Sequence, residues 1–394
     1  MKAEIDNIRK LGDWLNHPEP AVFQGLDLTD YEVSLTNTNL IDCVFLGCEI
    51  TDKTAEYAAS QKCLLVPRFP NLPFEAFEPG LYSPDELYDL YDPENSATSY
   101  EHCLDRKIYV SFMDPKTRKP VPSDVDVIIA RRIHDASIAE ALDDVLDLSR
   151  RKRSVAIMGG HDFPRDQELY KTVATLCLEL TLEGYFIVTG GGPGLMEAAN
   201  LGAYCAGFSS PNESLNFVME SIREAPKYND PDWLRLSYKA WKSLGTPPDF
   251  EKSRSLGIPT WFYGHEPPNV FATDIAKYFE NSIREEGLLA IALAGVIFAQ
   301  GNAGTVQEIF QDACQNYYST YDSIKSPMIL FDVEYWLPTP PLRHHAGDRR
   351  KPVYELLKKL AIEKGFIDRL LITDSTDAAK ALIRKFSPIA INGD

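Results

Sequence analysis

The sequence lacks the features that mark several common protein classes. Its longest apolar run, residues 288–299, is too short to cross a bilayer, and its N-terminus has no signal-peptide pattern. The seven cysteines are scattered and form no Cys-x-x-Cys pair, which argues against a zinc site and a disulfide framework. No Gly-Lys-Ser/Thr triplet is present, so the chain has no Walker phosphate loop. These absences favour a protein of the reducing cytoplasm with no membrane partner.

Positive charge is also scarce. The 394 residues include 40 Lys and Arg against 58 Asp and Glu, a formal net charge of −18. This balance argues against a nucleic-acid partner bound through a basic surface. The basic run at residues 150–153 lies beside a predicted strand start, and we interpret it as a solvated domain edge. A small anion can still bind where backbone amides and a few cations converge.

Residues 1–150 are expected to form an N-terminal accessory domain of mixed, partly β structure. Apolar residues recur every five positions at Leu35, Leu40, Phe45 and Ile50, which resembles a short pentapeptide-repeat coil. Turn signals are dense from residue 68 to about 123. Helical spacing returns over residues 135–148, directly after a cluster containing Arg131, Arg132 and His134 that we expect to be solvated.

Residues 151–394 show a regular alternation of strands and helices. Such alternation predicts a doubly wound, Rossmann-like parallel sheet of the α/β class, in which ligands bind at the carboxyl ends of the strands. A long helix is expected from about residue 269 to residue 292. Strands are expected at residues 154–158, 185–189, around 216–219, 295–299, 327–333 and 370–373.

Two glycine-rich loops follow predicted strands. The first contains Gly190, Gly191, Gly192, Gly194 and Met196, and it does not fit the G-x-G-x-x-G fingerprint of dinucleotide-binding proteins. Three consecutive glycines followed by Pro-Gly instead suggest a loop that wraps a compact anion. The second contains Gly301, Asn302, Gly304 and Thr305 and opens a helix, whose N-terminus suits a phosphate.

Glu308 and Arg284 are the candidate reactive side chains, and each has a structural alternative. Thr305 and Glu308 fit a capping box, whereas Glu308 also lies off the apolar stripe of its helix and can face a ligand. Arg284 could form an exposed pair with Glu280. About 11 residues, roughly 16 Å of helix, separate Arg284 from the next strand. A five-residue strand returns about the same distance at roughly 3.3 Å per residue. Arg284 is therefore expected level with the second loop.

These motifs together are similar to those of the LOG (Lonely Guy) phosphoribohydrolases, long mislabelled as lysine decarboxylases, and of the related nucleotide 5′-monophosphate nucleosidases. The resemblance covers roughly residues 150–385 and rests on GGGxGLM, on GxxGTxxE, and on the arginine-bearing helix between them. The first loop is one residue shorter than in the small family members, as in the larger nucleosidases, which also carry an extra N-terminal region. Gln300 stands where the family has proline, and Asn302 replaces a glycine.

The resemblance implies an enzyme that hydrolyses the N-glycosidic bond of nucleoside 5′-monophosphates. Glu308 and Arg284 would be catalytic, and the two glycine loops would hold the phosphate. No cofactor or metal is implied, and the family suggests at least a homodimer. The alternative is a non-catalytic nucleotide or cofactor binder akin to a molybdenum-cofactor carrier. Candidates for a base pocket are Gly160, His161, His265 and Glu266, although the last two lie in a loop that could simply be packed aromatic structure.

Overall fold

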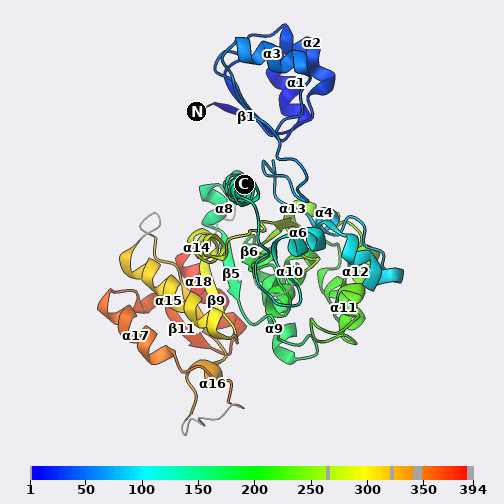
Figure 1. The fold of residues 1–394 in the computed structure, drawn as a ribbon. Helices are drawn as coiled ribbons and strands as arrows, with labels where there is room; N and C mark the ends of the chain where they lie inside the picture. Colours follow the sequence, from blue (N-terminus) through cyan, green and yellow to red (C-terminus); the bar gives the residue numbers. More distant parts are fainter. Residues whose placement is uncertain (1, 263–266, 320–323, 340–347, 388–394) are drawn as a thin grey trace.

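The computed structural model describes residues 2–262, 267–319, 324–339 and 348–387. An N-terminal unit forms a lobe of its own, joined to the main body by the stretch after β4 (Figure 1). The lobe is a four-stranded parallel sheet in the order β1-β2-β3-β4. Its elements are β1 (Ala3–Ile5), α1 (Ile8–Asn16), β2 (Ala21–Gln24), η1 (Thr29–Tyr31), α2 (Glu32–Thr36), β3 (Val44–Leu46), α3 (Asp52–Ser60) and β4 (Leu64–Val66).

The predicted pentapeptide coil is wrong. Leu35 lies in helix α2, Leu40 in a turn and Phe45 in strand β3, and all three are buried in one small core. Strand partners are 18 to 22 residues apart along the chain, as in Ala3–Ala21 and Val22–Val44. The five-residue spacing therefore reflects a helix, a turn and a strand that each place one side chain in the same core.

The main body contains a seven-stranded, fully parallel sheet in the order β11-β10-β9-β5-β6-β7-β8, which confirms the predicted α/β class. The chain starts at the central β5, builds outward to β8, then returns to build the other half from β9. Its strands are β5 (Ser154–Met158), β6 (Phe186–Thr189), β7 (Ser255–Gly257), β8 (Asp274–Ile275), β9 (Gly295–Phe298), β10 (Met328–Phe331) and β11 (Leu370–Thr373).

Both faces of this sheet are covered, because every residue of β5 is buried. Alternate side chains enter different cores: Val155 and Ile157 on one face, Ala156 and Met158 on the other. The core that contains Val155 includes side chains of α9 (Glu168–Leu182), α10 (Leu195–Cys205), α11 (Pro211–Ile222), α12 (Trp233–Leu244) and α18 (Thr376–Phe386). The core that contains Ala156 includes side chains of α7 (Val125–Val145), α14 (Asn281–Ile291), α15 (Ala303–Tyr318), α16 (Val333–Trp336) and α17 (Tyr354–Glu363).

The segment between the lobe and β5 packs on the main body. Side chains from Phe74 to Leu146 share a hydrophobic core with the sheet. The boundary expected at residue 150 stays a prediction, but this packing ties much of the preceding segment to the sheet. The remaining elements are α4 (Pro84–Leu87), η2 (Pro93–Asn95), α5 (Ser96–Ser99), η3 (Tyr100–His102), α6 (Leu104–Phe112), α8 (Leu148–Arg151), α13 (Phe250–Ser253) and η4 (Ile367–Arg369).

Two other predicted elements are corrected. The strand expected around residues 216–219 lies inside helix α11, which begins with a proline and buries Leu215, Val218 and Ile222 along one face. The long helix expected from residue 269 begins only at Asn281, because strand β8 and an extended stretch come first.

Candidate functional site

A cavity of about 460 Å³ opens at the carboxyl ends of β5, β6 and β9. It lies where the chain reverses its direction of winding, between β5 and β9. This topological switch point is where open α/β sheets bind ligands. The cavity is lined by the predicted residues Gly160, His161, Gly190, Gly192, Met196, Arg284, Asn302, Gly304, Thr305 and Glu308.

The other predicted site residues are placed differently. Gly191, Gly194 and Gly301 belong to the same loops but are not among the residues that line the cavity. His265 and Glu266 lie outside the described residues. Nearby Trp261 is buried in the core and donates from Nε1 to Asp105 Oδ1 at 2.9 Å, so at this residue the aromatic loop is packed structure.

Helix α15 begins three residues earlier than the capping-box alternative requires. Its N-cap is Asn302, whose φ of −99° is extended backbone, and its first internal bond runs from Val306 N to Asn302 O at 3.2 Å. Thr305 is therefore in the first turn and does not cap. The amide groups of residues 303–305 precede that bond and have no intrahelical partner, so they are available to an anion in the cavity.

Glu308 lies on the cavity side of this helix. It follows Gly304 by four residues and Thr305 by three, which places all three on one helical face. Its side chain is only 10% exposed. Five residues at 1.5 Å rise put it about 7.5 Å along the axis from the start of the helix. Because helical side chains lean toward the N-terminus, the carboxylate lies nearer the amides than this backbone distance.

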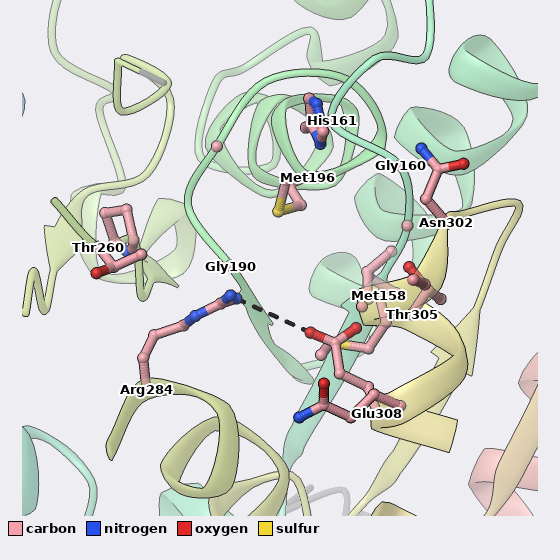
Figure 2. Close-up of a pocket in the computed structure, with 17 residues that line it drawn as sticks. Met158, Gly160, His161, Gly190, Met196, Thr260, Arg284, Asn302, Thr305 and Glu308 are labelled. Atoms are coloured by element: carbon pink, nitrogen blue, oxygen red, sulfur yellow. Dashed lines mark ion pairs between the residues drawn. The ribbon is translucent and has the colours of Figure 1, made fainter. Parts of the chain in front are cut away.

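Arg284 approaches Glu308 from helix α14. Its Nη1 lies 3.9 Å from Glu308 Oε1, and the two side chains point toward each other across the cavity (Figure 2). Asn281 Oδ1 accepts from Arg284 Nε and Nη2 at 3.3 and 3.2 Å, which fixes the guanidinium. The alternative partner, Glu280, instead pairs with Arg132 at 2.8 Å. The proposed exposed pair of Arg284 with Glu280 is therefore wrong.

The loop after β6 needs its glycines for space and for backbone shape. Gly194 has φ +69°, and a Cβ there would lie 2.3 Å from the Gly160 carbonyl oxygen. At Gly190 an added Cβ would come within 2.7 Å of Met196 Sδ and 3.2 Å of Arg284 Nη1. A side chain at Gly194 would therefore push against the backbone of the loop after β5, whereas a side chain at Gly190 would displace the ends of the Met196 and Arg284 side chains.

A buried amide network holds this loop, and the sequence analysis did not identify it. Asn269 Nδ2 donates to Gly192 O at 3.1 Å and to Asn200 Oδ1 at 3.0 Å. The same Asn200 oxygen accepts from Thr189 Oγ1 at 2.7 Å, and its amide donates to Ser255 Oγ at 3.0 Å. The available signal was Asn200 itself, a polar residue in the middle of a largely apolar helix that also buries the charged residue Glu197.

The two loops are joined through Gly160, which follows β5. Gly160 N donates to Gln300 O at 2.8 Å, and Leu195 N donates to Gly160 O at 3.3 Å. The Gln300 side chain donates to Asp332 Oδ2 at 2.5 Å. Tyr335 donates its hydroxyl to Gly301 O, and burial raises the pKa of that hydroxyl. Gln300 thus helps to anchor the second loop.

Several residues of the cavity were missed from the sequence. Met158 ends β5, and Pro259 and Thr260 follow β7. Strand β7 has only three residues, which is too short for a recognisable periodicity. The cavity residues that follow it were therefore not predicted. His161, which was predicted, lines the cavity, and its ring packs in a T-shaped arrangement against Tyr228 with ring centroids 5.4 Å apart.

Comparisons with known proteins do not assign this chain to a family. A scan against protein-family models and a search of curated proteins both give no match to this chain. In the part of the chain that the structure describes, no helix is both long and apolar enough to cross a membrane. No group of three or more His, Cys, Asp or Glu in that part is arranged to hold a metal ion. The site must therefore be interpreted from its own geometry.

Proposed function

We propose that this protein hydrolyses nucleoside 5′-monophosphates to a free base and ribose 5-phosphate. The observation that carries the proposal is the convergence, in one cavity, of an open helix N-terminus, two glycine loops and the Arg284–Glu308 pair. The cavity volume of about 460 Å³ falls in the range of small-molecule sites. The family resemblance supports the same chemistry.

The phosphate is expected at the start of α15. The amides of Ala303, Gly304 and Thr305 and the positive end of the helix dipole favour a dianion there. Glu308 lies about 7.5 Å further along the helix, from its 1.5 Å rise per residue. Because helical side chains lean toward the N-terminus, the Glu308 carboxylate lies closer to the amides than this, within reach of the ribose of a nucleotide whose phosphate binds there. The scissile bond would then lie beside the carboxylate.

Glu308 and Arg284 have complementary roles in this proposal. Cleavage of the C1′–N bond leaves positive charge on the ribose, which a nearby carboxylate stabilises. Glu308 also positions the water whose oxygen bonds to C1′. The electron pair of the broken bond goes to the base, where Arg284 stabilises it until a proton from water completes the free base. No step requires a metal ion.

A panel of purine and pyrimidine monophosphates tests the proposal, with base and ribose 5-phosphate quantified by chromatography. Each nucleotide is paired with its nucleoside, which lacks the phosphate. The proposal predicts release from at least one monophosphate and at least about tenfold slower release from its nucleoside. If every nucleotide binds but none is cleaved, the protein is a non-catalytic binder. The implied homodimer is tested separately, by light scattering.

A further inference from the structure

A second cavity, of about 260 Å³, lies between the start of α7 and the segment that leads into α14. No described residue lines both this cavity and the one at the strand ends. Its wall is largely apolar and aromatic. The side chains that matter here are Phe112, Val121, Ile128, Arg131, Phe262 and Phe279.

Arg131 is a buried charge in the wall of this cavity. The residue is 8% exposed, which corrects the expectation that the cluster around it is solvated. Of its five N–H donors, the structure gives one hydrogen bond, from Nη2 to Ser111 O at 2.9 Å, and its Nε has no partner. Among the described residues, no carboxylate lies within ion-pair distance of it. A buried cation without a counter-ion is costly, so such groups are normally paired.

Two phenyl rings hold the guanidinium at the cavity. Arg131 Cζ lies 4.8 Å from the ring centroid of Phe112 and 5.6 Å from that of Phe279, and both rings line the cavity. Contact with ring faces offsets part of the lost hydration of a cation. Burial lowers the pKa of the Arg131 guanidinium, with no opposing contribution from an acid. Arginine nevertheless stays charged in proteins.

The other charged groups of the cavity are already occupied. Arg132 pairs with Glu280 at 2.8 Å. Asp135 accepts backbone hydrogen bonds from Phe279 N and Glu280 N, both at 2.9 Å. Arg131 is therefore the charged group of this described wall that has neither an ion-pair partner nor a hydrogen-bond partner for its Nε, and it lines a space large enough for a small molecule.

We propose that this cavity binds a small anion with a flat apolar body, of the class of an aromatic carboxylate. The carboxylate takes the place of the missing counter-ion of Arg131. The ring packs among Phe112, Phe279 and Val121, where it removes apolar surface from water. This site is independent of the function proposed for the larger cavity, although it adjoins Glu280, the N-cap of the helix that carries Arg284.

The test compares 4-fluorobenzoate with 4-fluorobenzamide, a neutral ligand of nearly the same shape, by fluorine NMR titration of the full chain. We expect the carboxylate to bind about tenfold more tightly or better, because a hydrogen bond to a charged group is stronger than a neutral one. Equal affinity of the two ligands, or binding of neither at millimolar concentration, overturns the proposal.

Three arginine variants locate the binding. Arg131→Met removes the charge and should abolish the preference for the carboxylate. Arg132→Met is the matched control, since this neighbour lines the same cavity but is paired and its side chain is 58% exposed. Arg284→Met addresses the larger cavity. The preference should survive in both controls; its loss in Arg284→Met, or its survival in Arg131→Met, overturns the assignment.

A further variant keeps the test decisive if Arg131→Met does not fold. Ile128 lines the cavity and is 47% exposed, so a larger side chain there is tolerated by the fold. Ile128→Trp narrows the cavity and should weaken both ligands. Unchanged affinity for both ligands in this variant would show that they bind elsewhere.

Discussion

Two arginine–glutamate pairs lie near the glycine loop after β6. They have the same composition but differ in hydrogen bonding, in the distance between their charges and in whether they line a cavity. The side chains of Arg165 and Glu197 are at most 1% exposed and form a fork, with Nε–Oε2 at 2.8 Å and Nη2–Oε1 at 2.5 Å. Glu197 also accepts from Tyr170 at 3.0 Å. Arg284 and Glu308 approach to only 3.9 Å, beyond hydrogen-bond distance, and line a cavity.

The difference shows how environment assigns a role to the same two side chains. The guanidinium of Arg165 also donates from Nη1 to Ala225 O and Trp233 O, so this pair ties together three segments of the main body. The looser pair comes from two separate helices, and both of its side chains line the cavity, where they can contact a ligand. We infer that the first pair stabilises the fold and that the second acts on a bound molecule.

Breaking the tight pair should have the largest effect. Glu197→Gln leaves the Arg165 charge buried without a partner, so we expect a loss of about 3–5 kcal/mol in the free energy of unfolding. Denaturant unfolding followed by circular dichroism measures it. A loss below 1 kcal/mol would contradict a structural role for this pair.

Breaking the loose pair from the arginine side should affect the reaction instead. If the proposed function holds, Arg284→Met slows release of the base about 100-fold, the scale for loss of one charge-stabilising donor. The free energy of unfolding should change by less than the about 3–5 kcal/mol expected for the tight pair, because Arg284 and Glu308 are too far apart to share a hydrogen bond and both line the cavity. Initial rates and a denaturant series separate the two effects. A large loss of stability with an unchanged rate would reverse the two roles.

The glycines of the two loops extend the comparison. Gly194→Ala forces a Cβ to 2.3 Å from a carbonyl oxygen at φ +69° and should cost about 1–3 kcal/mol of stability. Gly304→Ala is the control, because no atom lies within 4 Å of its added Cβ and alanine favours helix. Thermal unfolding should therefore show a lower midpoint for the first variant and an equal or higher midpoint for the second. Equal midpoints would contradict the claim that close packing requires glycine at position 194.

A second carboxylate on α15 sharpens the contrast with Glu308. Asp312 follows by one turn, is buried, and its Oδ2 has no hydrogen-bond partner. Burial raises the pKa of its side chain to about 8. Above about pH 4 the unfolded chain has lost the proton that the native state keeps, so stability falls as pH rises toward 8.

Asp312→Asn removes this titration. The variant should gain about 1–2 kcal/mol over the original protein at pH 8 and much less near pH 4, the scale of one uncompensated buried polar group. Urea unfolding at several pH values measures the difference. A difference that stays constant with pH would contradict the raised pKa.

Much of the sheet could be predicted from the sequence, because its strands are runs of buried apolar residues. Residues 154–158 and 370–373 coincide with β5 and β11. Strands β7 and β8 are three and two residues long, and local patterns cannot reveal elements that short. The helix at Pro211–Ile222 was mistaken for a strand because a short apolar stretch within it fits either structure.

The candidate site was less accessible from sequence where it depends on distant contacts. The glycine spacing and the distance along α14 correctly brought Arg284 near Glu308. The capping-box alternative failed because Asn302, not Thr305, begins the helix. The support of the loop by Asn200 and Asn269, 69 positions apart, exists only in the folded chain.

The central claim is that Glu308 accelerates cleavage of the glycosidic bond and contributes little to the affinity for the nucleotide. Its most direct test measures the rate of base release and the nucleotide dissociation constant for the original protein and for Glu308→Gln. The account predicts a rate about 10²–10³-fold lower, the scale for loss of one transition-state-stabilising group, with a dissociation constant within about threefold of the original. Equal rates, or a loss of affinity as large as the loss of rate, would contradict it.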